Sequence, residues 1–154
     1  DSIHGGRFIK PGRVVILLAG RYAGKKAVVI RCYDDGAKER NFAHCLVAGI
    51  EKAPLRVKQD MSEKKQTRRL RAKPFVKYVN YQHIMPTRYL VTNETIDMKS
   101  IVNEEEMGSI GSRKDIKKSL RNLFLEKWRK RAAIRGERGV AAHVEFLFTK
   151  LRFQ

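Results

Sequence analysis

The chain has 154 residues, of which 42% are hydrophobic, and its 34 Lys and Arg exceed its 16 Asp and Glu to give a formal net charge of +18. This length and apolar fraction allow one domain, or one domain with an elaborated tail. The charge excess favours a polyanionic partner such as nucleic acid, whereas no apolar run approaches the roughly 20 residues that span a bilayer, so we expect no membrane partner.

The first predicted elements are a short arm and a β-hairpin. Residues 1–10 lack the apolar core of a signal peptide, which predicts a soluble, intracellular protein. Runs rich in Val and Ile at residues 14–18 and 27–30 have the length of strands. In the loop between them, Gly20 and Gly24 allow positive φ and a close approach of the backbone to a partner. Cations and an aromatic ring in such a loop are typical of RNA contacts. The four candidates are Arg21, Tyr22, Lys25 and Lys26.

Three further strands are expected in the N-terminal half. The run HCLVAGI at residues 44–50 contains small residues, including Gly49, which indicate tight packing or a bulge. Residues 75–81 alternate between two faces, as a strand covered on both sides does. Pro86 is expected to end that strand, and residues 88–91 are expected to form another. Five short strands without long helices between them favour a small barrel or a sandwich.

A basic insertion at residues 58–73 separates the third and fourth strands. A helix from residue 62 to residue 70 would have almost no apolar face, so we expect a segment that becomes ordered on a partner. We favour direct contact with an RNA backbone over a solvated face or an import sequence. The candidates in and after this insertion are Lys64, Lys65, Arg68, Arg69, Arg71, Lys73, Lys77 and Arg88.

Composition changes again after residue 91. Residues 92–111 are acidic on balance and predict a linker. Ser112 and Asp115 form a variant of the capping box, so a helix is expected to begin there and to end at Gly136 and Gly139. Its apolar residues recur at three- and four-residue steps, which predicts a packing stripe. The remaining, basic surface predicts further phosphate contacts through Lys117, Lys118 and Arg121.

The last stretch, residues 144–153, is strongly aromatic and is expected to be an extended tail. Enzymatic chemistry is poorly supported, because the four histidines are dispersed and no phosphate-loop, dinucleotide or serine-hydrolase motif occurs. We therefore expect no catalytic residue, no metal, no cofactor and no small-molecule substrate. Cys32 and Cys45 lack metal or redox spacing and are expected to be reduced thiols on neighbouring strands.

The segment 10–36 resembles the KOW motif of ribosomal proteins and of transcription elongation factors of the NusG type. The shared elements are a Lys-Pro-Gly turn at 10–12, two apolar strands, Gly20, and Gly24 followed by Lys25. Ala27 stands where many such segments carry a further Gly. This motif alone does not choose among its families.

Longer blocks resemble one family, the eukaryotic large-subunit ribosomal proteins numbered twenty-seven in the eukaryotic series, which are unrelated to their bacterial namesake. The blocks are LLAGRYAGKKAVV (17–29), HCLVAGI (44–50), FVKYVNYQHIMPTRY (75–89) and FTKLRF (148–153). The resemblance implies a mainly β protein with an α extension, in which an SH3-like barrel precedes a basic amphipathic helix and a tail. The implied divisions are a barrel at 1–91, an acidic linker at 92–111 and an extension at 112–154.

The resemblance also implies a function. A structural constituent of the large (60S) subunit would bind ribosomal RNA and neighbouring ribosomal proteins without forming a homo-oligomer. It would lie in the cytosolic ribosome after passing through the nucleus and nucleolus. Tyr22, Tyr81 and Tyr89 are candidates for stacking on unpaired bases. The alternatives are a KOW-type transcription elongation factor, another RNA-binding module, or a small RNA-modifying enzyme.

Overall fold

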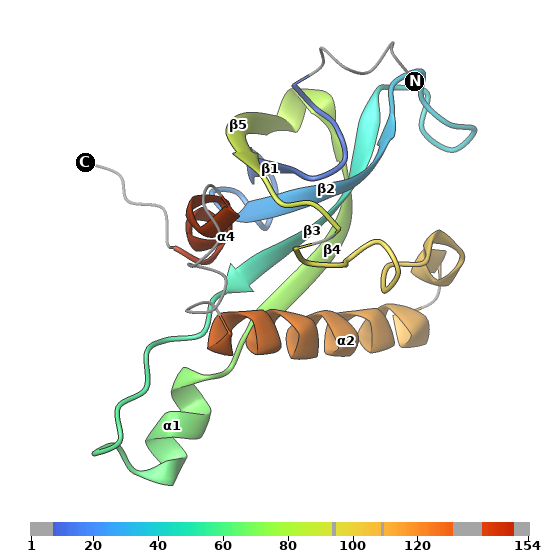
Figure 1. Cartoon of the computed structure of the whole chain (residues 1–154). Coiled ribbons are helices and arrows are strands. Elements are labelled where there is room, and N and C mark those ends of the chain that lie inside the picture. The colour runs from blue at the N-terminus through green and yellow to red at the C-terminus, as the bar shows by residue number, and fades with distance from the viewer. Residues whose placement is uncertain (1–7, 94, 109, 131–139, 150–154) are drawn as a thin grey trace.

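The computed structural model describes residues 8–93, 95–108, 110–130 and 140–149. Its centre is a five-stranded antiparallel sheet in the order β4-β3-β2-β1-β5, with α2 crossing one face and α1 extending beyond α2 (Figure 1). The strands are β1 (Arg13–Leu17), β2 (Lys26–Tyr33), β3 (His44–Lys52), β4 (Lys73–Asn80) and β5 (Ile84–Leu90). The helices are α1 (Glu63–Arg69), α2 (Ile110–Arg129) and α4 (Val140–Phe148), with short 3-10 helices η2 (Tyr81–His83) and η3 (Glu104–Gly108).

All five predicted strands are present, which confirms the mainly β character of the N-terminal half. The expectation that Pro86 interrupts the chain between strands is wrong, because Pro86 lies within β5 and is paired with Val15. β5 is an edge strand, and the missing N–H of a proline is tolerated there. Cys32 and Cys45 are not joined in a disulfide and are direct partners on β2 and β3, as expected. Burial raises the pKa of the Cys45 thiol to about 12.

One face of the sheet is packed with side chains from the strands themselves. Phe75 of β4 and Ile84 of β5 belong to the same buried cluster, although their strands form opposite edges of the sheet. The sheet therefore curls around this face. The strand pairings in the described part of the chain leave β4 and β5 as edges, so the ladder of hydrogen bonds is not closed.

The opposite face is covered by the C-terminal half of the chain. The apolar stripe of α2 packs there through Ile116, Leu120 and Phe124, which confirms its predicted packing role. This helix begins at Ile110, so the capping box expected at Ser112 and Asp115 is wrong. None of the helices in the described ranges combines the length and apolar character needed to cross a membrane.

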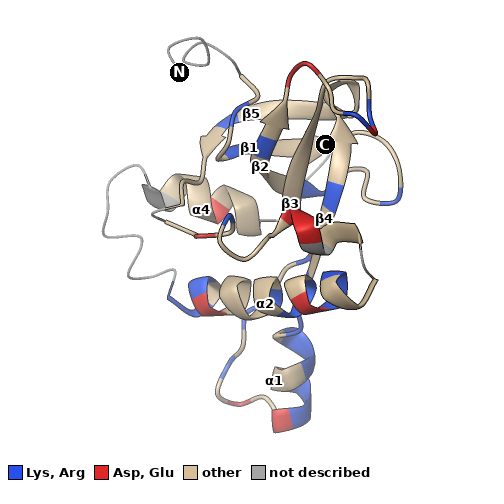
Figure 2. Ribbon diagram, turned by 90° about the vertical axis from the view of Figure 1, so that its right-hand side faces the viewer, with Lys and Arg blue, Asp and Glu red and all other residues tan. Residues whose placement is uncertain are grey.

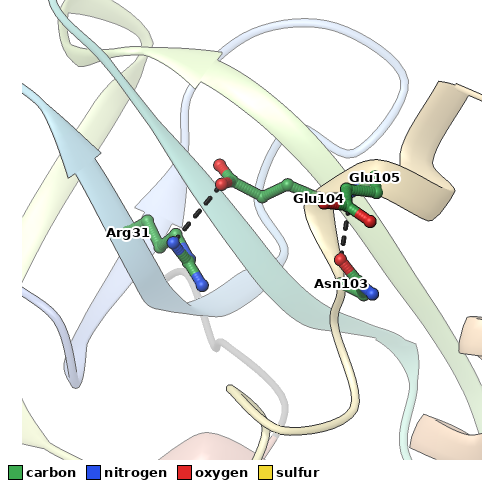
Figure 3. Close-up of polar contacts among 4 residues, drawn as sticks. All are labelled: Arg31, Asn103, Glu104 and Glu105. Atoms are coloured by element: carbon green, nitrogen blue, oxygen red, sulfur yellow. Dashed lines mark hydrogen bonds and ion pairs between the residues drawn. The ribbon is translucent and has the colours of Figure 1, made fainter.

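The acidic segment before α2 also packs on the sheet. Ile96, Met98 and Val102 are buried in the same cluster as the α2 stripe. At the surface, Glu104 of η3 forms an ion pair of 3.4 Å with Arg31 of β2, and the main-chain N–H of Glu105 donates to Asn103 (Figure 3). These contacts tie the segment to the sheet through apolar burial and through charge.

The extended tail expected from residue 144 is wrong over residues 144–148, which belong to helix α4. Val144, Leu147 and Phe148 are buried at helical spacing against the sheet, so tertiary packing selects the helix. The rest of that expected tail at 150–153, the helix end expected at Gly136 and Gly139, and residues 1–7 of the arm lie outside the described residues.

Candidate nucleic-acid interface

The loop between β1 and β2 is closed by main-chain hydrogen bonds. The N–H of Gly24 donates to the oxygen of Leu17 at 2.7 Å, and the N–H of Leu17 donates to the oxygen of Lys25 at 3.0 Å. Gly20 and Gly24 have φ values of +84° and +82°, which glycine adopts without the strain of a Cβ atom. The loop is therefore a compact turn, in which Arg21 is exposed and Tyr22 and Lys25 are half-buried.

Tyr22 turns one face of its ring toward the protein. The ring stacks on Phe75 of β4 with centroids 4.1 Å apart and planes within 5°. The guanidinium of Arg21, which is exposed, lies 5.4 Å from the centroid of the Tyr22 ring. Tyr22 therefore joins the loop to the sheet, and one of its faces is not available to a nucleic-acid base.

Lys26 is buried, whereas the neighbouring Lys25 is half-buried. The side chain of Lys26 is only 6% exposed, and its ammonium donates to the main-chain oxygens of Phe146 and Thr149 at 2.7 and 2.6 Å. The ammonium also lies 3.7 Å from the centroid of the Phe146 ring. Burial lowers its pKa to about 8, so the group stays protonated at neutral pH. These contacts remove Lys26 from the candidate interface.

The basic insertion contains helix α1, which projects from the body of the protein beyond α2 (Figures 1 and 2). None of its residues is buried. The hydroxyl of Ser62 accepts from the N–H of Lys65 at 3.3 Å, and the amide of Gln66 donates to the oxygen of Met61 at 2.9 Å. Local capping of this kind supports a helix that has no apolar face.

The insertion presents most of its cations to solvent. Lys64, Lys65 and Arg68 are exposed on α1, as are Arg71, between α1 and β4, and Lys73, the first residue of β4. Arg69 is half-buried and donates to the oxygen of Arg56 at 2.7 Å. The predicted candidates of this segment therefore form a largely exposed, projecting basic surface.

The other candidates lie on different elements. Lys118 and Arg121 are exposed on α2, and Lys117 is half-buried there. Arg88 is exposed on β5, with its guanidinium 4.8 Å from the centroid of the Tyr89 ring. The structure thus distributes the candidates over separate surfaces, and Figure 2 shows positive charge along α1 and at several positions of α2.

Two cations at the start of α2, Arg113 and Lys114, are further candidates that the sequence patterns did not identify. Sequence spacing could have identified Arg113, since Arg113, Lys117 and Arg121 lie four residues apart and fall near one face of a helix.

Comparison with known proteins gives a consistent match over most of the chain. A model of the Ribosomal L27e protein family matches residues 14–154. The large ribosomal subunit protein eL27 of Tetrahymena thermophila is 47% identical over 147 residues, which is 96% of this chain and 99% of that protein. The eL27B protein of Saccharomyces cerevisiae is 39% identical over 147 residues, 96% of this chain and 98% of its own length. The match of the family model therefore covers nearly all of the sheet and the three α-helices of the described ranges.

Proposed function

Because this chain belongs to the Ribosomal L27e protein family, we propose that it acts as a structural constituent of the large ribosomal subunit and binds ribosomal RNA there. The observation that carries this proposal is the identity of 47% across 96% of the chain to a large-subunit ribosomal protein. The role is structural and not catalytic. The net charge of +18 supplies the attraction to a polyanion that this role requires.

The proposed mechanism is charge neutralisation combined with shape. Exposed and half-buried Lys and Arg side chains contact RNA phosphates, and each phosphate neutralised releases condensed counterions. The proposed contacts are Arg21, Lys25, Lys64, Lys65, Arg68, Arg69, Arg71, Lys73, Lys77, Arg88, Lys117, Lys118 and Arg121.

Stacking on bases has a smaller part in this mechanism. The Tyr22 ring is stacked on Phe75, and the Tyr89 ring is stacked on Phe146 with centroids 4.1 Å apart. The hydroxyl of Tyr81 donates to Asp34 at 2.8 Å. Each of these tyrosines already serves the protein's own packing, so phosphate contacts carry most of the proposed binding.

The finer description of the fold is also a proposal. An SH3-like barrel with a KOW segment is supported by the curl that brings Phe75 and Ile84 into one cluster, and by the turn with its two positive-φ glycines. The division into a barrel at 1–91, a linker at 92–111 and an extension at 112–154 stays a prediction. Buried residues between 92 and 111 show only that this segment contributes to the core.

The proposed location is the cytosolic ribosome, reached after assembly in the nucleus and nucleolus. Its partners there are ribosomal RNA and neighbouring ribosomal proteins, with one copy of this chain per site. A transcription elongation factor of the KOW class is the rival function, and the RNA-polymerase association expected of such a factor distinguishes the two.

Sedimentation of ribosomes through sucrose after a high-salt wash tests the proposal. A structural constituent should remain with the large subunit through the wash, because its contacts with RNA and with neighbouring proteins must all break together before it is released. Release of the chain to the top of the gradient, together with recovery on RNA polymerase, would contradict the proposal and support the elongation factor.

A further inference from the structure

The ammonium of Lys77 reaches the loop between β1 and β2, although Lys77 lies on β4. A Cβ atom built on Gly20 would lie 3.1 Å from the Nζ atom of Lys77. Gly20 carries no side chain, so the backbone beside this ammonium stays open to a third group. Nothing lies within 4 Å of the corresponding position on Gly24, which leaves the neighbouring part of the loop open as well.

The stacked pair formed by Tyr22 and Phe75 explains why the loop and β4 meet. Phe75 and Lys77 are two residues apart on a strand, so their side chains point to the same face. The Tyr22 ring covers Phe75, and Arg21 lies against that ring at 5.4 Å. This arrangement places Arg21 and Lys77 beside the same loop. Lys25 belongs to that loop, where its main-chain N–H donates to the oxygen of Tyr22 at 3.0 Å.

The three cations have no carboxylate partner among the described residues. The ion pairs there are Arg31 with Glu104, Arg40 with Glu39, and Lys130 with Glu126. Positive charges held near one another without counter-charge favour an anion at the point where they converge. A flexible ammonium supplies a point charge, and a guanidinium supplies two parallel donors to the oxygens of a phosphate.

We infer that Arg21, Lys25 and Lys77 form one binding site for a single phosphodiester group of RNA at the open surface of Gly20. This inference rests on the proposed RNA-binding function and adds that these cations act as a unit. Tyr22 is a positioning residue in this site, because its ring holds Arg21 beside β4. Lys77 therefore acts with the hairpin loop and not with the basic insertion that precedes it in the sequence.

The test measures binding to deproteinised large-subunit ribosomal RNA by filter retention over a range of salt concentrations. The variants are Arg21→Gln, Lys25→Gln and Lys77→Gln, singly and together. If the three cations share one phosphate, the slope of log K against log salt in the triple variant falls by about 0.9, the value for one phosphate. A fall of about three times that amount would show three separate contacts and overturn the shared site.

A double-mutant cycle gives a second measurement. The effects of Arg21→Gln and Lys77→Gln should be non-additive, whereas Arg21→Gln and Lys117→Gln, on the separate element α2, should add. Tyr22→Ala should remove the coupling between Arg21 and Lys77, and Tyr22→Phe, which keeps the stacked ring, should restore it. Additive behaviour of Arg21 and Lys77 contradicts the site.

The outcomes separate this inference from the proposed function. A wild-type affinity that hardly changes with salt would contradict RNA binding as a whole. A steep wild-type salt dependence with unchanged binding by the triple variant would contradict only the site. Equal unfolding midpoints for the variants and the wild type exclude loss of folding as the cause.

Discussion

The ammonium of Lys26, at the start of β2, lies 2.6 Å from the main-chain oxygen of Thr149, just beyond the end of α4. It also donates to the oxygen of Phe146. The last carbonyl groups of a helix have no partners within the helix, and a cation there interacts favourably with the helix dipole. One side chain of the N-terminal hairpin thus holds the C-terminal helix on the sheet.

Replacing Lys26 with Met should lower the free energy of unfolding by roughly 1–2 kcal/mol, because two carbonyls lose a charged donor while the apolar stem is kept. Lys25→Met is the matched control, since this neighbouring lysine lies in the loop and makes none of these contacts. We expect it to change stability by less than about 0.5 kcal/mol. Urea unfolding measures both variants, and equal stability of the two would refute the anchoring role.

The anchoring role of Lys26 also changes how the loop should be tested in ribosomes. An Ala substitution of Arg21, Lys25 and Lys26 together would remove RNA contacts and the α4 anchor at the same time. Replacing only Arg21 and Lys25 should impair incorporation into large subunits and leave the unfolding midpoint unchanged. Normal incorporation of this double variant would mean that the loop is an ordinary surface turn.

The stability contributed by Lys26 should depend on pH. Burial lowers its pKa from 10.5 to about 8, so between these values the unfolded chain binds the proton more tightly than the folded chain. The free energy of unfolding should therefore rise with pH through this window, because the cost of burying the charge disappears while the neutral amine can still donate. The difference in free energy of unfolding between wild type and Lys26→Met should therefore increase from about pH 7 to about pH 10. A constant or shrinking difference would contradict this assignment.

Gly49 on β3 should tolerate no side chain. A Cβ atom there would overlap the Phe75 ring and lie 2.7 Å from the main-chain oxygen of Lys26. Gly49→Ala should lower the free energy of unfolding by about 1–3 kcal/mol through overpacking. Gly108→Ala is the control, because nothing lies within 4 Å of the corresponding position there. Equal thermal midpoints of the two variants would show that the sheet accommodates the extra methyl group.

Helix α1 should contribute charge to RNA binding and little to stability. Changing Lys64, Lys65 and Arg68 together to Gln should reduce the salt slope by about 0.9 for each phosphate that these side chains neutralise in the wild type. The free energy of unfolding should change by less than about 0.5 kcal/mol, since no residue of α1 is buried. Ser62→Ala keeps these charges and removes only the cap, so it should leave the salt slope unchanged. An unaltered slope in the charge variant would mean that α1 does not bind RNA.

Local sequence patterns predicted the structure correctly where the periodicity of a segment's own side chains shows which of its faces are buried. The β-branched runs at 14–18 and 27–30 predicted two strands that pair in the sheet, and the alternation from Phe75 to Val79 predicted a strand buried on both faces. The periodic stripe of Ile116, Leu120 and Phe124 likewise predicted its packing role. In these segments the period of the apolar side chains matches their burial in the structure, so residues nearby in the sequence were enough to predict the element.

Local patterns failed where a distant partner makes the choice. Residues 144–148 have the aromatic composition of a strand or tail, yet they form a helix because Val144, Leu147 and Phe148 find a surface on the sheet. Pro86 was expected to end a strand, yet it lies within β5, an edge strand in which its missing N–H costs no hydrogen bond. Packing against residues far away in the chain overrides local preference in both places.

The sequence by itself determined the charge, the strands, the packing stripe of α2 and the family, because each follows from composition, short-range periodicity or matching blocks of residues. Only the tertiary structure decided which of the cations lie at the surface and which are buried. Lys25 and Lys26 are adjacent in the sequence, but one lies in the loop and the other is buried beneath α4. Lys77 joins the loop only because the curl of the sheet carries β4 over it. The availability of a charge depends on what covers it, and the covering elements are distant in the chain.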